Sequence, residues 1–341
     1  VFLRQQDFPV HKYILGSKRV TSHQSKMRIL KCSRAVYFLG FILLFIAVIT
    51  FWNQNSTPEA KHTQFINISR KFQSFLQVRN TSFDFRVETM RMNEAKVPMD
   101  DSRLIQLIRN YWIEPPSREP YNLNKDLEDY SAGQTPYVDS RINHLENGFF
   151  IEAGAFDGEF SSTSLYFEKY RKWNGLLVEP DPRHFIKLQA KHRKAYRINA
   201  CLSTKPYPTM VTFNMGYGIR EQMGRVHETK EAEEWIKKEH IGFTSVKVQC
   251  FPLYSLLLAM EIKQLDFFSL DVEGEELHVL ETIPFDKINI RIMTVEYIHS
   301  SEEGITRYLE ERGYKKLIKL KTLGCADIIF IKTDVPYNGY E

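Results

Sequence analysis

The sequence predicts a doubly wound α/β sheet that ends in an antiparallel hairpin and is preceded by a transmembrane helix. From residue 148 onward, short apolar runs alternate with stretches of helical pattern, as expected for parallel strands joined by crossover helices. The last two apolar runs are separated by only four residues, which is too short for a crossover and suits a hairpin. Residues 35–52 contain no charged side chain, which is typical of a membrane span.

The predicted strands are runs of the kind that parallel sheets bury on both faces. They cover residues 149–153, 176–179, 196–200, 265–271 and 290–296, with helices at 161–169, 182–192, 275–282 and 301–312 and a final hairpin of 316–321 and 326–332. This layout is that of the Rossmann-like class I methyltransferase fold. An insertion interrupts it, in which 209–214 and 245–251 can pair as strands around a charged helical stretch at 228–239.

Composition excludes several classes of protein. The chain has 341 residues, of which 43% are hydrophobic and 26% charged, so collagen, coiled coil and wholesale disorder are ruled out. The formal net charge is only +4, which gives no concentrated basic face, and we therefore expect no nucleic-acid partner.

The apolar stretch at 35–52 predicts a single helix through the lipid bilayer. The residues before it are basic, whereas the same distance after it carries mixed charge, so the positive-inside rule places the N-terminus in the cytoplasm and the rest in the lumen. The basic residues are Lys26, Arg28, Lys31 and Arg34. We therefore expect a single-pass type II membrane protein.

The chain then divides into five parts. Residues 1–34 form a cytoplasmic tail, which we expect to be N-terminally incomplete because it begins with Val1, and 35–52 form the transmembrane helix. A lumenal stem at 53–120 carries glycosylation sequons at Asn55, Asn67 and Asn80. A lead-in segment at 121–147 precedes the compact domain at 148–341.

A cofactor site is predicted at the ends of the first two strands. Glu152, Gly154, Asp157 and Gly158 follow the first strand in the spacing of a tight turn that brings backbone against a nucleotide-like ligand. Glu179 ends the second strand, where an acid can bind ribose hydroxyls. The pattern lacks the G-x-G-x-x-G form, so S-adenosylmethionine fits better than NAD. A glycine turn that serves packing alone is the competing interpretation.

Two acids at the end of a later strand are the candidate catalytic residues. Asp271 and Glu273 would lie at the carboxyl edge of the sheet, where they could act as a general base, bind a metal or cap the next helix. Their pattern alone assigns no metal site. Glu296 and His299, after the next strand, are weaker candidates for proton transfer.

Four cysteines rule out a scaffold built from disulfides. Cys201 and Cys250 could form one disulfide in an oxidising lumen. No C-x-x-C spacing indicates a metal cluster.

Three motifs resemble the FkbM-type methyltransferase family: residues 148–159, 177–181 and 266–274. This resemblance covers about 147–332 and implies S-adenosylmethionine and O-methyl transfer, with Glu152, Gly154, Gly158 and Glu179 at the cofactor. Residues 131–134, 200–203 and 250–253, together with the membrane anchor, resemble the Star-like group of arthropod proteins within that family.

The Star-like resemblance implies a different function. It implies an escort that helps membrane-bound precursors of EGF-receptor ligands move from the endoplasmic reticulum to the Golgi and through endosomes, with the chain in those membranes and at the plasma membrane. Trafficking is the first hypothesis, because a lumenal enzyme would need S-adenosylmethionine transported from the cytosol. The alternative is an O-methyltransferase acting on a glycan or small lumenal substrate. No oligomeric state is predicted.

Overall fold

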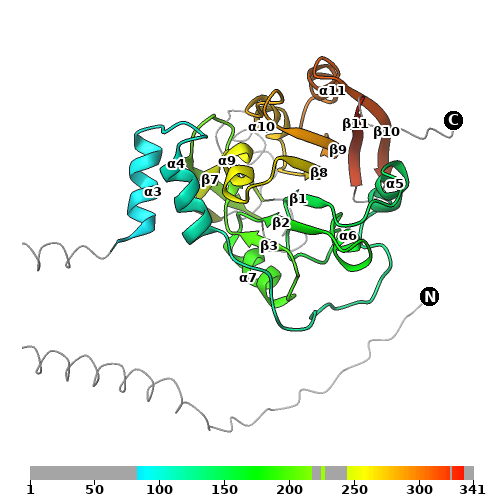
Figure 1. Cartoon of the computed structure of the whole chain (residues 1–341), viewed down its shortest axis with the longest axis horizontal. Helices are drawn as coiled ribbons and strands as arrows, with labels where there is room; N and C mark the ends of the chain where they lie inside the picture. Colours follow the sequence, from blue (N-terminus) through cyan, green and yellow to red (C-terminus); the bar gives the residue numbers. More distant parts are fainter. Residues whose placement is uncertain (1–82, 217–223, 227–243, 323–324, 334–341) are drawn as a thin grey trace, which may run out of the picture. The chain divides into compact units, whose positions relative to one another are not determined.

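The computed structural model describes residues 83–216, 224–226, 244–322 and 325–333. Within them, seven strands form one mixed sheet in the order β10-β11-β9-β8-β1-β2-β3 (Figure 1). The sheet is parallel from β9 to β3, and β11 runs antiparallel to both of its neighbours, so the predicted methyltransferase-like α/β fold and its final hairpin are confirmed. The strands are β1 (Phe149–Ala153), β2 (Asn174–Val178), β3 (Tyr196–Ile198), β8 (Gln264–Leu270), β9 (Asn289–Glu296), β10 (Tyr314–Thr322) and β11 (Cys325–Lys332).

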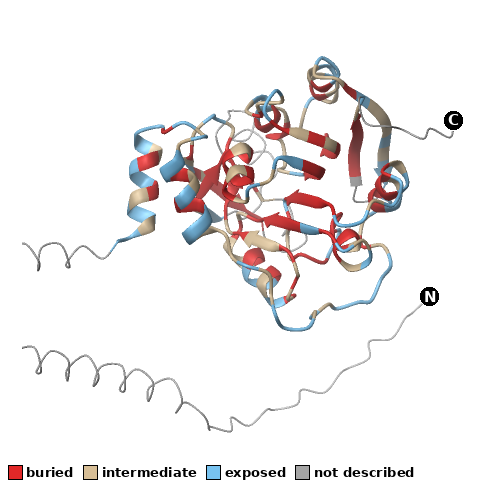
Figure 2. Ribbon diagram, in the orientation of Figure 1, coloured by how far each residue is buried: buried red, intermediate tan, exposed pale blue. Residues whose placement is uncertain are grey.

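Helices cover both faces of this sheet because successive strand residues point to opposite sides. Ile151 joins a core with helices on one face, and its neighbour Phe150 joins a second core on the other. Figure 2 shows the central strands as buried. The first face carries α9 (Leu253–Ala259), α10 (Glu276–Glu281) and α11 (Glu302–Glu310), and the second carries α5 (Gln134–Arg141), α6 (Leu165–Tyr170) and α7 (Pro182–Ala190).

The start of α7 fixes the turn that follows β2. Asp181 is the N-cap and its side chain accepts a hydrogen bond from the Arg183 amide at 2.8 Å, while Pro182 takes the first helical position. This cap ends the turn just after Glu179, so the side chain of Glu179 stays at the carboxyl edge of the sheet.

The insertion forms a second sheet in the order β4-β7-β5-β6. Its strands are β4 (Cys201–Leu202), β5 (Thr209–Met215), β6 (Arg225–Val226) and β7 (Thr244–Phe251). The predicted pairing of the two insertion strands is confirmed, since β5 and β7 are antiparallel with Val211 opposite Val248. Cys201 lies opposite Cys250, and a disulfide joins them, as the sequence allowed.

The predicted start of the compact domain at residue 148 is wrong. The compact unit begins at Asp84, so the second half of the expected stem and the whole lead-in segment belong to the fold. Three added helices are α3 (Phe85–Glu94), α4 (Ser102–Leu107) and η1 (Ile108–Trp112), the last a π-helix. Leu104 and Ile108 are fully buried, and the Arg109 guanidinium donates to the Ala259 carbonyl at 2.7 Å. The stretch is amphipathic in sequence, but the core that its apolar side joins becomes apparent only in the folded chain.

Several predictions fall outside the described residues. These are the cytoplasmic tail at 1–34, the transmembrane helix at 35–52, the sequons at Asn55, Asn67 and Asn80, and the helical stretch at 228–239. Among the helices that the structure does describe, none is both long and apolar enough to span a bilayer.

Candidate functional site

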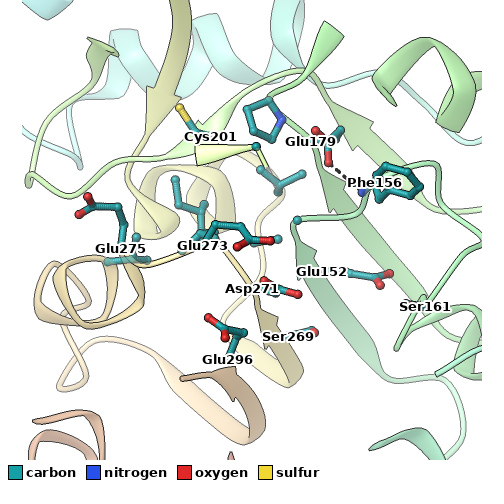
Figure 3. Close-up of a pocket in the computed structure, with 18 of the residues that line it drawn as sticks. Glu152, Phe156, Ser161, Glu179, Cys201, Ser269, Asp271, Glu273, Glu275 and Glu296 are labelled. Carbon is teal, nitrogen blue, oxygen red and sulfur yellow. Dashed lines mark hydrogen bonds between the residues drawn. The ribbon is translucent and has the colours of Figure 1, made fainter. Parts of the chain in front are cut away.

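A cavity of about 280 Å³ opens at the carboxyl ends of the parallel strands. This is where α/β sheets bind ligands, and the volume is just below the roughly 300–1,000 Å³ typical of small-molecule sites. Its walls come from the turns after β1, β2, β8 and β9 and from the second sheet (Figure 3). The predicted residues that line it are Glu152, Gly154, Glu179, Asp271 and Glu273, together with the weaker candidates Glu296 and His299.

Gly154 brings the ends of three strands together. Its φ is +87°, and a Cβ atom there would lie 2.0 Å from the carbonyl oxygen of Asp271. Its amide donates to the Val178 carbonyl at 3.0 Å. A side chain at this position would therefore push apart the turns after β1 and β8, and only glycine allows the close approach.

Glu152 lines the cavity, but its carboxylate is engaged by its own chain. It accepts hydrogen bonds from the Ser162 hydroxyl and the Thr163 amide, both at 2.9 Å, and from the Ser164 hydroxyl. These donors lead into α6, so Glu152 ties the end of β1 to the start of the next helix. These contacts give Glu152 a role in orienting this wall of the cavity.

Asp157 and Gly158 do not line the cavity. The Asp157 carboxylate accepts from the amides of Glu159 and Phe160 at 2.9 and 2.8 Å. Gly158 has φ +78°, and a Cβ atom at this position would lie 3.1 Å from the Leu188 side chain. The two residues shape the turn that carries Phe160, whose side chain reaches the cavity.

Glu179 is buried in the wall at the end of β2. One carboxylate oxygen accepts from the Phe156 amide (Figure 3) and the other from the Asp181 amide, each at 2.8 Å. The His184 ring nitrogen lies 3.9 Å away, and that ring packs on Phe156. Burial raises the pKa of Glu179 to about 8, although the two amides act in the opposite direction.

This raised pKa predicts that stability falls as the pH rises. Between the unfolded value of about 4.3 and the folded value of about 8, the folded chain holds a proton that the unfolded chain releases, so unfolding becomes easier with increasing pH. Urea unfolding should show this effect when Glu179→Gln is compared with wild type. The free energy of unfolding of the variant, relative to that of the wild type, should rise by about 2 kcal/mol from pH 6 to pH 8. A difference independent of pH would contradict the raised pKa.

The opposite wall is rich in carboxylates. Asp271 follows β8 and Glu296 ends β9, and Figure 3 shows their side chains together with that of Glu273. Asp271 is open to the cavity yet lies deep in the protein, and this depth, followed by the charges of Glu273 and Glu296, raises its pKa. Burial, followed by the charge of Glu276, raises the pKa of Glu296 to about 8.

Glu273 adopts an unusual backbone conformation. Its φ is +59°, in the left-handed region that a bulky side chain rarely occupies, and its carboxylate pairs with His299 Nε2 at 3.2 Å. Such strain tends to mark functional turns. The predicted catalytic acid and the weaker candidate His299 are thus brought into contact.

Other parts of the cavity escaped the sequence analysis. Phe160 and Ile298 line it although 56% and 59% of their surface is exposed. Cys201 and Phe213, from the second sheet, form a further wall. No local pattern marks these residues, because they meet only when the insertion folds against the strand ends.

Comparison with known proteins finds a family match within this domain. Residues 152–316 match the family model described as the methyltransferase FkbM domain. No curated protein matches the chain.

Several solved structures are similar at low identity. Methyltransferase FkbM from Methylobacillus flagellatus KT is 14% identical, with a TM-score of 0.33, and the match covers 54% of this chain and 43% of that one. A methyltransferase from Pyrococcus furiosus is 13% identical over 73% of this chain and 99% of that one, with a TM-score of 0.31. The METTL16 methyltransferase domain is 14% identical over 74% and 100%, with a TM-score of 0.32. The chain therefore spans less than half of the M. flagellatus protein.

Proposed function

We propose that the domain binds S-adenosylmethionine and methylates a hydroxyl group of a small acceptor. The observation that carries this proposal is that Gly154 and Glu179 line one cavity at the carboxyl ends of β1 and β2. The match of residues 152–316 to the methyltransferase FkbM domain supports it.

The residues in the wall suit this cofactor. Each oxygen of the Glu179 carboxylate accepts one amide and retains a further acceptor position, which can take a ribose hydroxyl. The cofactor carries its methyl group on a positively charged sulfur, and acidic side chains in the cavity wall suit that charge. At Gly154 the backbone itself forms the wall, because no side chain fits there.

The acidic wall suits the acceptor. A hydroxyl that is methylated must lose its proton, and the carboxylates of Asp271 and Glu273 line the cavity where they can accept it. Phe160 and Ile298 offer apolar surface at the same cavity. We therefore expect an acceptor that presents a hydroxyl beside an apolar group.

The test is calorimetric titration of S-adenosylmethionine into the full chain. Wild type should bind in the micromolar range, a binding free energy of about 8 kcal/mol. Glu179→Gln should weaken binding at least tenfold, about 1.4 kcal/mol, because it replaces one acceptor oxygen with an amide nitrogen that can only donate. Glu275→Gln is the matched control, since Glu275 also lines the cavity but its carboxylate is engaged by His278 at 2.8 Å. Equal affinities for all three folded proteins would exclude this site.

A membrane-anchored escort is the second candidate function. It is supported by the uncharged stretch at 35–52, the basic residues before it and the sequons at Asn55, Asn67 and Asn80. On this proposal the lumenal domain binds growth-factor precursors as cargo in the endoplasmic reticulum and Golgi. A folded wild-type chain that binds no S-adenosylmethionine in the titration would favour the escort over the enzyme.

A further inference from the structure

We propose that Asp271 and Glu296 bind a divalent cation at the carboxyl ends of β8 and β9. The two strands are parallel neighbours, and Leu270 lies opposite Val295, so the residues that follow each of them come side by side. One carboxylate oxygen from each of Asp271, Glu276 and Glu296 lies within 4.8 Å of the other two.

One oxygen of the Glu296 side chain has no partner in the part of the chain that the structure describes, and a bound cation would provide one. Its Oε1 atom accepts from the Ile298 amide, whereas its Oε2 atom is buried without a hydrogen-bond partner among the described residues. Only 7% of the residue surface is exposed, so water has little access to this oxygen. Buried acceptors are normally satisfied, and an exception of this kind points to a bound group.

Charge around the cluster points to a cation in particular. Glu273 and Asp327 also act on Asp271 and Glu296 as like charges. Glu273 has His299 as its ion-pair partner, but none of the ion pairs among the described residues involves Asp271 or Glu296. Carboxylates this close repel one another, and a bound cation would offset that repulsion.

Glu276 holds the loop and is not counted among the ligands. Its two oxygens already accept from the amides of Val272 and Gly274 and from the Ser300 hydroxyl. These bonds fix the loop that directly follows Asp271. Glu276 therefore acts as a positioning residue for the Asp271 carboxylate.

The ligand set identifies the class of cation. Carboxylate oxygens alone suit hard divalent ions such as Mg²⁺, Mn²⁺ and Ca²⁺. Two oxygens on opposite sides of a Ca²⁺ ion, each about 2.4 Å from it, would lie about 4.8 Å apart, so oxygens that lie within 4.8 Å of one another can share one ion. Asp271 is open to the cavity, so water or an acceptor oxygen can complete the coordination.

The test measures binding of Mn²⁺ to the full chain by electron paramagnetic resonance. We expect one Mn²⁺ per chain, displaced by Ca²⁺ or Mg²⁺, with affinity at least tenfold weaker in Glu296→Gln and in Asp271→Asn. Glu275→Gln should change the affinity less than twofold, because Figure 3 shows its carboxyl group pointing away from the other acids. Asp271 is exposed, so Asp271→Asn provides a test even if Glu296→Gln does not fold.

Two results would overturn the proposal. One is Mn²⁺ binding that is absent, or equal in wild type and both variants, while circular dichroism shows folded protein. The other is binding of methylammonium in place of Mn²⁺, which would make the cluster a site for organic cations. Neither measurement contains S-adenosylmethionine, so the outcome does not depend on the proposed methyltransferase function.

Discussion

Gly154→Ala is expected to lower the free energy of unfolding by about 3 kcal/mol or more and to abolish binding of S-adenosylmethionine. The new Cβ would lie 2.0 Å from the backbone oxygen of Asp271, which is far inside van der Waals contact. Separating the two turns to relieve this clash costs about 1–3 kcal/mol, and the positive φ adds about 1–2 kcal/mol. Urea unfolding and calorimetric titration of the full chain measure the two effects.

Gly133→Ala is the matched control for this substitution. Gly133 has a similarly positive φ of +101°, but a Cβ atom there would have no neighbour within 4 Å. It should therefore cost only the conformational strain, about 1–2 kcal/mol. If both substitutions cost the same, the close approach of the turns after β1 and β8 does not constrain the domain.

Removing the disulfide is expected to have an effect of similar size on the free energy of unfolding. Cys201 and Cys250 are 49 residues apart in sequence, and a cross-link that closes such a loop stabilises by about 4 kcal/mol through the entropy of the unfolded chain. Only two residue pairs join β4 to β7, so the bond also holds the wall of the cavity that Cys201 lines. We expect Cys201→Ala/Cys250→Ala to unfold at lower urea by this amount.

Reduction provides the control for that variant. Dithiothreitol should lower the urea midpoint of the wild type to that of the double variant and should leave the double variant itself unchanged. A wild type whose midpoint does not respond to the reductant would argue that the two thiols are not joined in solution.

The sheet could be predicted because its signals are local. The run at 149–153 matches β1 in full, and the four residues between the last two runs allowed only a hairpin. Helix α9 was missed, since Leu253–Ala259 follows β7 directly and has no polar face to reveal helical period. The start of the domain was missed because the short amphipathic stretch of α4 and η1 does not by itself show which core it packs against.

The candidate site was predictable only where a strand end carries the residue. Gly154, Glu179 and Asp271 each follow or end a buried parallel strand, and parallel strands bring their carboxyl ends to one edge of the sheet. Asp157 and Gly158 belong to the same motif as Gly154, but they lie in the turn and do not line the cavity. Their roles as cofactor ligands remain predictions.

The sequence by itself determined the strands of the main sheet and the crossover helices between them, the hairpin, the pairing of the insertion strands and the acids at the strand ends. These depend on periodicity and spacing, which are properties of neighbouring residues. The tertiary structure decided which carboxylates are already occupied by the chain, as in Glu152 and Glu276, and which retains an unpartnered buried oxygen, as in Glu296. Hydrogen-bond partners and burial arise from segments far apart in sequence, so they appear only when the chain is folded.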